Sequence, residues 1–173
     1  MNLSFENKVA LVTGAGAGMG LAAARAFVES GAAVAMVDIN EAAVRAAGEQ
    51  LSAEGHKILA LRCDVADDAQ VQAMVEETVS TFGRLDAAFN NAGVQSPAVE
   101  IADSTSEEFD RVTAINLRSV WSCWDTDLLC FVHQNDKRQF IAFARLKVNV
   151  MNRLNVTAFP HVHVYVGVRR KLL

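Results

Sequence analysis

The chain has 173 residues, of which 51% are hydrophobic and 21% charged, and this size and composition predict one globular domain with a sizeable core. A net charge of -4 provides no basic surface for nucleic acid and no polybasic segment for a membrane, so small molecules are the expected partners. The N-terminus lacks the features of a secretory signal, and no stretch approaches about 18 apolar residues, which predicts a cytoplasmic protein.

From Lys8 onward, short β-branched runs alternate with helical patterns, which is typical of repeated βαβ units. The predicted strands cover residues 9–13, 33–38, 58–61 and 85–90, and the predicted helices cover 19–30 and segments that begin near residues 40, 67 and 104. This alternation predicts an α/β fold with a Rossmann-like, doubly wound parallel sheet. Its expected strand order is 3-2-1-4, truncated after the fourth strand, with a strand from the tail as a candidate extension.

The predicted helices have recognisable boundary signals. Asn40 is placed to cap the second helix, and Asp67 with Gln70 resembles a capping box at the start of the third. Gly31 and Gly83 are placed to end the first and third helices. These signals make the helix boundaries more specific than hydrophobic periodicity alone.

The last predicted helix begins at Ser104, with Glu107 completing a second capping box. Its apolar residues Phe109, Val112 and Ile115 recur at helical spacing and are expected to point toward the core. Trp121, near its end, is likewise expected to be part of the core or its cover.

The composition of the chain changes after Trp121. Residues 1–121 hold 25 of the 28 alanines and carry 8 basic against 17 acidic side chains, whereas residues 122–173 hold 3 alanines and carry 8 basic against 3 acidic. A separate domain of this length is not expected. We interpret residues 122–173 as a divergent tail that packs on the same domain or is partly disordered. One hypothesis is a frameshift, which a Tyr-xxx-Lys segment in another reading frame of the coding DNA would support.

Two tail segments have periodic patterns. Residues 140–154 are compatible with a helix, and residues 161–168 alternate like a strand. The second segment is the candidate to pair with the open edge of the fourth strand.

A glycine-rich segment, TGAGAGMG at residues 13–20, lies between the first predicted strand and the first predicted helix. Backbone N–H groups and the helix dipole at such a junction favour a phosphate. Gly14 allows a tight turn, Gly18 lets a pyrophosphate approach the backbone, and Gly20 lets the helix pack on its strand. This context favours a dinucleotide site, with Thr13 and Met19 in the same loop, over a purely structural turn.

Asp38 ends the second predicted strand and can accept hydrogen bonds from both hydroxyls of an adenosine ribose, while repelling a 2′-phosphate. Neither Ala17 nor Ile39 provides a cation for that phosphate. The expected cofactor is therefore NAD rather than NADP. A solvated aspartate at a turn is the alternative.

Further motifs follow the third and fourth strands and lie within the last helix, and with the glycine loop they carry a family resemblance. They comprise Asp64 and Val65, then Asn90, Asn91, Ala92 and Gly93, then Asn116. In order and spacing, residues 5–121 resemble the cofactor-binding half of the short-chain dehydrogenase/reductase family. The resemblance implies that residues 1–121 form an NAD-binding Rossmann half.

The same resemblance implies roles for individual residues. Asp64 and Val65 would contact the adenine, and Asn116 would belong to the catalytic tetrad. Asn90, Ala92 and Gly93 would line the cofactor and steady the sheet.

The family transfers a proton with a tyrosine and a lysine four residues later, and this pair is absent. The single tyrosine, Tyr165, is followed four residues later by Arg169, in a run typical of a strand rather than a helix. His161 and His163 alternate with valines in the same run, which favours an edge strand over a metal site. No metal is predicted. The cysteines Cys63, Cys123 and Cys130 show no CxxC spacing and are expected as buried or incidental thiols.

The resemblance implies an NAD(H)-dependent oxidoreductase that transfers hydride to or from a secondary alcohol or ketone, impaired here by the missing pair. The alternatives are a dinucleotide-binding module without catalysis and a truncated or frameshifted product. A homo-oligomer stays open, because family members commonly pair through helices that include the one with the tyrosine and lysine.

Overall fold

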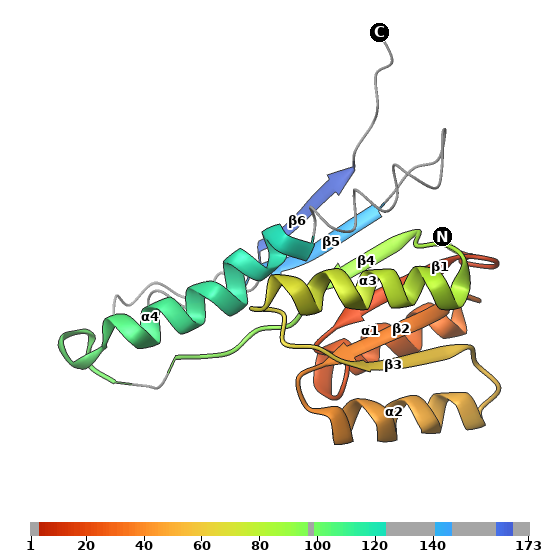
Figure 1. Cartoon of the computed structure of the whole chain (residues 1–173), viewed down its shortest axis with the longest axis horizontal. Coiled ribbons are helices and arrows are strands. Elements are labelled where there is room, and N and C mark those ends of the chain that lie inside the picture. The colour runs from red at the N-terminus through yellow and green to blue at the C-terminus, as the bar shows by residue number, and fades with distance from the viewer. Residues whose placement is uncertain (1–3, 97–98, 124–140, 147–161, 168–173) are drawn as a thin grey trace, which may run out of the picture.

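The computed structural model describes residues 4–96, 99–123, 141–146 and 162–167 (Figure 1). In the first of these ranges, strands alternate with helices as the sequence predicts. The strands are β1 (Val9–Thr13), β2 (Ala33–Asp38), β3 (Ile58–Arg62) and β4 (Ala87–Asn90). The intervening helices are α1 (Gly18–Glu29), α2 (Glu41–Ala53) and α3 (Asp68–Phe82). After β4 come a short 3-10 helix, η1 (Ile101–Asp103), then α4 (Ser106–Thr113) and a π-helical turn, η2 (Ala114–Arg118).

The strands form one sheet in the order β3-β2-β1-β4-β5-β6, and the first four are parallel. The predicted order 3-2-1-4 is therefore confirmed. β5 (Ile141–Leu146) lies parallel to β4, and β6 (Val162–Gly167) pairs antiparallel with β5.

The tail therefore extends the sheet, but not in the predicted way. The helix expected over 140–154 is wrong at residues 141–146, which form β5, and β6 pairs with β5 rather than with β4. The open edge of β4 explains the difference, because its unpaired N–H and C=O groups favour a strand beside it over an isolated helix.

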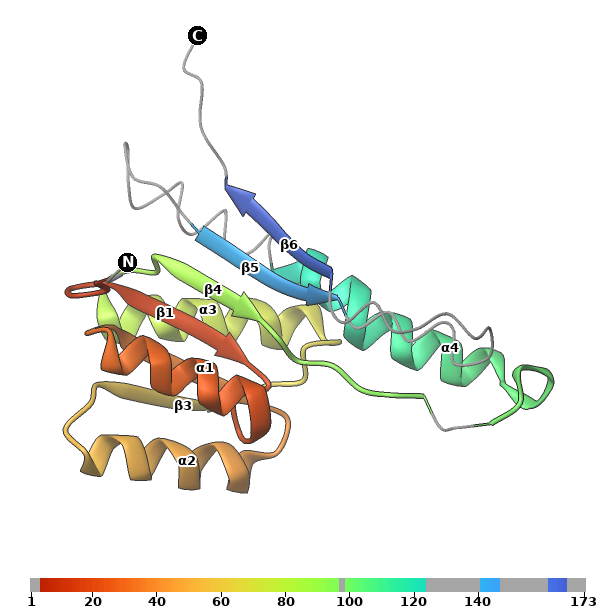
Figure 2. The ribbon, with the colours of Figure 1, turned by 180° about the vertical axis from the view of Figure 1, so that it is seen from behind.

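Helices cover both faces of the sheet. α1 and α2 pack through Ala24, Val28, Val44 and Leu51 onto one face, which β1 and β2 supply with Val12 and Met36. α3 packs on the other face, where its Val71, Met74 and Val75 contact a cluster that includes Leu11 and Val37. Figure 1 shows α3 in front of the sheet, and Figure 2 shows α1 in front of it from the opposite side. The result is a three-layer Rossmann-type fold.

Side chains cap the helices where the sequence predicts. The side-chain Oδ1 of Asn40 accepts a hydrogen bond from the Ala43 N–H, and the Asp67 carboxylate accepts hydrogen bonds from the N–H groups of Ala69 and Gln70. Gly31 and Gly83 have φ values of 95° and 77°, in the left-handed region that ends a helix with little strain for glycine. The predicted caps and terminal glycines are found in the structure because each depends only on neighbouring residues in the sequence.

α4 differs from the prediction at its start and on its apolar face. Thr105, not Ser104, caps it by accepting from the Glu108 N–H at 3.2 Å. Phe109 is 64% exposed and Trp121 is 70% exposed, so the expectation that Phe109 points toward the core is wrong, as is the assignment of Trp121 to the core or its cover. Val112 and Ile115 are half-buried. In both views, α4 and η2 form one helix that extends away from the parallel strands, so much of its length has no sheet beneath it (Figures 1 and 2).

None of the helices in the described part of the chain is both long and apolar enough to cross a membrane.

Candidate functional site

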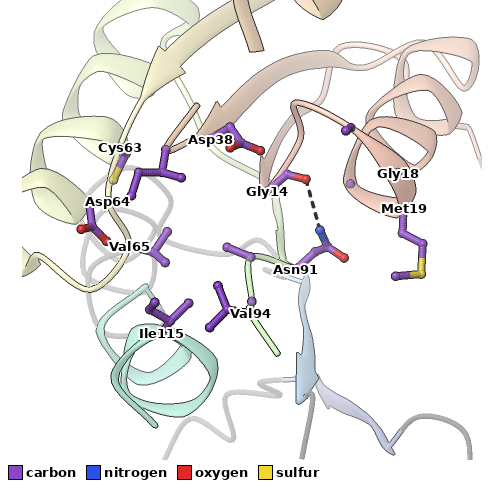
Figure 3. Close-up of a pocket in the computed structure, with 15 residues that line it drawn as sticks. Gly14, Gly18, Met19, Asp38, Cys63, Asp64, Val65, Asn91, Val94 and Ile115 are labelled. Atoms are coloured by element: carbon purple, nitrogen blue, oxygen red, sulfur yellow. Dashed lines mark hydrogen bonds between the residues drawn. The ribbon is translucent and has the colours of Figure 1, made fainter. Parts of the chain in front are cut away.

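A pocket of about 390 Å³ opens at the carboxyl ends of the parallel strands (Figure 3). This volume lies within the range of small-molecule sites. Most predicted cofactor residues line it: Gly14, Gly18, Met19, Gly20, Asp38, Asp64, Val65, Ala92 and Gly93. The sequence-based list omitted six further lining residues: Ala17, Ile39, Cys63, Asn91, Val94 and Ile115. The position of the first five follows from strand topology, since the loops after β1, β2, β3 and β4 meet at one edge of the sheet, whereas Ile115 comes from η2.

The glycine loop joins β1 to α1 along this pocket. Gly14 and Gly18 have φ values of 66° and 56°, which disfavour other residue types. At Gly20 the restriction is space, because a Cβ there would lie 1.9 Å from the Gly14 carbonyl oxygen. A Cβ at Gly18 would meet nothing within 4 Å, so this position faces open space on the pocket side. The loop is therefore shaped both by backbone conformation and by room for a ligand.

The α1 N-terminus has no side-chain cap, whereas Asn40, Asp67 and Thr105 cap α2, α3 and α4. No acidic side chain lies in the first turn of α1. The positive end of the helix dipole at Ala17 and Gly18 thus lies at the pocket, and no acidic side chain of the first turn offsets it. Such a terminus favours a bound anion.

Asp38 is held in place by two backbone groups. Its Oδ2 accepts a hydrogen bond from the Gly16 N–H at 2.9 Å, and its Oδ1 accepts from the Asn40 N–H at 2.9 Å. Among the lining residues that the structure describes, Asp38 and Asp64 are the charged side chains, and none is a lysine or arginine. A ligand at this end of the pocket therefore meets hydrogen-bond acceptors with negative charge.

Thr13 does not line the pocket but joins its two central loops. The side chain is 1% exposed, and its Oγ1 accepts hydrogen bonds from the N–H groups of Asn91 and Ala92, both at 3.0 Å. Asn91 in turn donates from Nδ2 to the carbonyl oxygens of Thr13 (3.1 Å) and Gly14 (3.4 Å), the latter drawn in Figure 3. Asn91 thus locks the glycine loop onto the end of β4. The Asn-Asn repeat was the available signal for its role.

Asn90 and Asn116 lie beside the pocket rather than in its lining. Asn90 is 2% exposed, and its side-chain oxygen and nitrogen have no hydrogen-bond partner among the described residues. The Asn116 side chain accepts from the Val94 N–H and donates to the Val94 carbonyl oxygen, both at 2.8 Å. Asn116 therefore holds the backbone of Val94, a pocket-lining residue in the segment after β4.

Of the tail residues considered for catalysis, Tyr165 is among those that the structure describes. Tyr165 lies in β6, opposite Phe143 of β5, and not on a helix. Arg169 and His161 lie outside the described residues, and no group of three metal-ligating side chains occurs among the residues that are described.

Cys63 and Cys123 are buried, as expected, while Cys130 lies outside the described residues. Burial, with the nearby charges of Asp64 and Asp67, raises the pKa of the Cys63 thiol to about 11. Since the thiolate is the reactive form, Cys63 should be alkylated at pH 7.5 at least about tenfold more slowly in the folded chain than in urea. Peptide mapping after iodoacetamide treatment measures this. Equal labelling in both states would contradict the buried placement.

Comparison with known proteins agrees with this architecture. The family model for short chain dehydrogenases matches residues 8–138. The 2,5-dichloro-2,5-cyclohexadiene-1,4-diol dehydrogenase of Sphingobium indicum is 32% identical over 168 residues, which cover 97% of this chain and 63% of that protein.

Two solved structures are similar as well. A short chain dehydrogenase/reductase from Burkholderia phymatum, in complex with NAD, has a TM-score of 0.74 and 30% identity, covering 78% of this chain and 47% of that one. The 3-ketoacyl-(acyl-carrier-protein) reductase from Brucella melitensis, complexed with NADH, has a TM-score of 0.71 and 35% identity. The match covers 75% of this chain and 52% of that one. The chain thus spans about half of these structures and under two thirds of the curated relative. With the matched fold, glycine loop and strand-end motifs, the chain belongs to the short-chain dehydrogenase/reductase family.

Proposed function

We propose that this chain binds NAD(H) in the pocket at the strand ends, as the cofactor-binding half of a short-chain dehydrogenase/reductase. The observation that carries the proposal is the Asp38 carboxylate, held by two backbone N–H groups beside the glycine loop. The two similar structures, described as complexes with NAD and NADH, support a nicotinamide dinucleotide. Asp38 favours the form without a 2′-phosphate.

The pocket residues fit the chemical parts of this cofactor. Gly14, Gly18 and the uncapped α1 N-terminus would hold the pyrophosphate, and Asp38 would accept from the adenosine ribose hydroxyls. Asp64 and Val65 would contact the adenine. Ala92 and Gly93 lie on the β4 side of the same pocket, where Asn116 positions Val94. The set combines backbone donors for an anion with acceptors for hydroxyl groups.

When bound, NAD would accept the hydride in oxidation of a secondary alcohol, and NADH would donate it in reduction of a ketone. Proton transfer needs a separate acid or base, and the sequence has no Tyr-xxx-Lys pair. Tyr165 lies in β6, and the residue four positions later in the sequence is Arg169 rather than a lysine. We therefore propose cofactor binding with impaired turnover, in the cytoplasm, with residues 122–173 as a divergent tail.

Cofactor titration followed by turnover assays tests this proposal. NADH fluorescence is measured while protein is added, and the chain is then assayed with NAD and a panel of secondary alcohols. Saturable binding without turnover supports the proposal. Turnover would instead support an active oxidoreductase, while absence of binding would reject the cofactor site. Sequencing the coding DNA for a Tyr-xxx-Lys segment in another frame tests the origin of the tail.

Replacing Asp38 with alanine should weaken NADH binding by at least about tenfold, because hydrogen bonds from the ribose hydroxyls to a charged group are lost. Binding of NADPH should not weaken, since the variant also removes the charge that repels its 2′-phosphate. Parallel fluorescence titrations with the two cofactors measure the change. Asp64→Ala provides a matched control for the ratio of NADH to NADPH affinity, because it removes a lining carboxylate that is assigned to the adenine rather than to the ribose. An unchanged NADH affinity in Asp38→Ala would contradict the assigned role.

A further inference from the structure

Gly16 lies within the glycine loop, but neither a positive φ nor a close approach to backbone explains it. Gly16 is not among the glycines with positive φ, so the backbone conformation at this position suits other residues. A Cβ built on Gly16 would instead lie 3.0 Å from Asp38 Oδ2, 3.1 Å from Asp38 Cγ and 3.1 Å from the Ala43 Cβ. The absent side chain therefore leaves the space that the Asp38 carboxylate occupies.

The Gly16 backbone also binds that carboxylate. Its N–H donates to Oδ2 at 2.9 Å, while the Asn40 N–H donates to Oδ1 at 2.9 Å, so each carboxylate oxygen has one fixed donor. Asp38 is half-buried, and rotation of its side chain would leave the Gly16 N–H without this partner. Within the described part of the chain, no pocket-lining lysine or arginine competes for the carboxylate. Its orientation thus depends on the two loops that flank it.

Ala43 limits how the site can adapt to a larger residue at position 16. Ala43 lies in the first turn of α2, where its N–H donates to the Asn40 cap at 3.1 Å. A Cβ at position 16 would be confined between this helix and the carboxylate, and the side chain of Asp38 is the group that can rotate. An alanine at position 16 would therefore displace the carboxylate from its present orientation.

We propose that Gly16 is a positioning residue that sets the preference for NAD(H) over NADP(H), by holding Asp38 on its N–H and leaving room for its carboxylate. This inference rests on the proposed cofactor site. Held in this way, the carboxylate keeps its free acceptor positions for two ribose hydroxyls and keeps a negative charge where a 2′-phosphate would lie. Displacing it would weaken both effects together.

The test compares Gly16→Ala, Asp38→Ala and the double variant with the unmodified chain, using dissociation constants for NADH and for NADPH. Gly16→Ala should raise the NADH constant about tenfold, as for one lost hydrogen bond to a charged group, without raising the NADPH constant. The double variant should have the same NADH to NADPH ratio as Asp38→Ala alone, because Gly16 acts through Asp38.

Two outcomes would overturn the inference: an unchanged ratio in Gly16→Ala, or a further change of the ratio when Gly16→Ala is added to Asp38→Ala. A general loosening of the loop would weaken both cofactors alike and would also count against it. If Gly16→Ala alone does not fold, the double variant, in which the crowded carboxylate is gone, still provides the comparison with Asp38→Ala. An unmodified chain that binds neither cofactor would reject the proposed function itself.

Discussion

Replacing Gly20 with alanine should destabilise the fold by about 3 kcal/mol and abolish measurable NADH binding, because overpacking against backbone cannot relax by rotation of a side chain. The new Cβ would lie 1.9 Å from the Gly14 carbonyl oxygen and 2.8 Å from Asn91 Nδ2. Either the glycine loop or the first turn of α1 must therefore move. Urea unfolding gives the change in free energy, and NADH fluorescence titration gives the change in binding.

Gly18→Ala is the matched control for this prediction. A Cβ at Gly18 meets nothing within 4 Å, and its cost comes from a φ of 56°, about 1 kcal/mol for a residue in the left-handed region. This variant should lose less stability than Gly20→Ala, but it should still weaken NADH binding, because the added methyl group faces the pocket. Equal stability of Gly20→Ala and the unmodified chain would show that the loop does not have the described close approach.

Replacing Asp86 with alanine should cost about 3 kcal/mol of unfolding free energy at pH 7, because it leaves the buried Val9 N–H and the Arg84 guanidinium without their carboxylate partner. The Asp86 carboxylate is 6% exposed and accepts hydrogen bonds from the Val9 N–H (3.0 Å), Lys8 Nζ (3.3 Å) and the guanidinium of Arg84. It therefore joins β1 to the start of β4, at the end of the sheet opposite the pocket. Asp86→Asn, which keeps an acceptor for the Val9 N–H, should cost less.

The effect of Asp86 should depend on pH. Burial by itself raises the pKa of this carboxyl group, but the hydrogen bonds from Arg84 and Val9 and the charges of Arg84 and Lys8 outweigh it and lower the pKa. A lowered pKa in the folded state stabilises the protein above the unfolded value of about 3.9, and this contribution is lost as the pH falls through the folded value. Urea unfolding at several pH values should show the gap between the unmodified chain and Asp86→Asn closing below about pH 4.

Glu54→Ala serves as the control, because the Glu54 to Arg25 ion pair lies on the surface and exposed pairs contribute little to stability. Its effect should be much smaller than that of Asp86→Ala. Equal effects of the two variants would contradict the structural role assigned to the buried carboxylate.

Local sequence rules predicted the first part of the fold, from β1 to α3, closely. β1 and β2 have the predicted bounds, and Asn40, Asp67 and Gly83 act at the predicted helix ends. Each of these features depends on neighbouring residues, so no knowledge of distant contacts was needed. The glycine loop and Asp38 were predictable for the same reason, because the β1 to α1 turn and the end of β2 lie at fixed places in a βαβ unit.

Features that depend on distant contacts were predicted less well. The sequence predicted a helix at residues 141–146 and an inward Phe109. Residues 141–146 instead pair as a strand with the open edge of β4, and Phe109 is exposed on α4, which extends away from the parallel strands (Figure 1). Asn91 was not included among the site residues, because its bonds to the carbonyl groups of Thr13 and Gly14 cross more than 70 positions in the chain.

The sequence by itself determined the βαβ order, the glycine loop, the carboxylate at the end of β2 and the absence of a Tyr-xxx-Lys pair. Only the tertiary structure decided which groups hold that carboxylate and which glycines are required by space rather than by φ. It also decided how the tail joins the sheet. The physical reason is that local propensities act between neighbouring residues, whereas crowding, burial and strand pairing depend on atoms that only folding brings together.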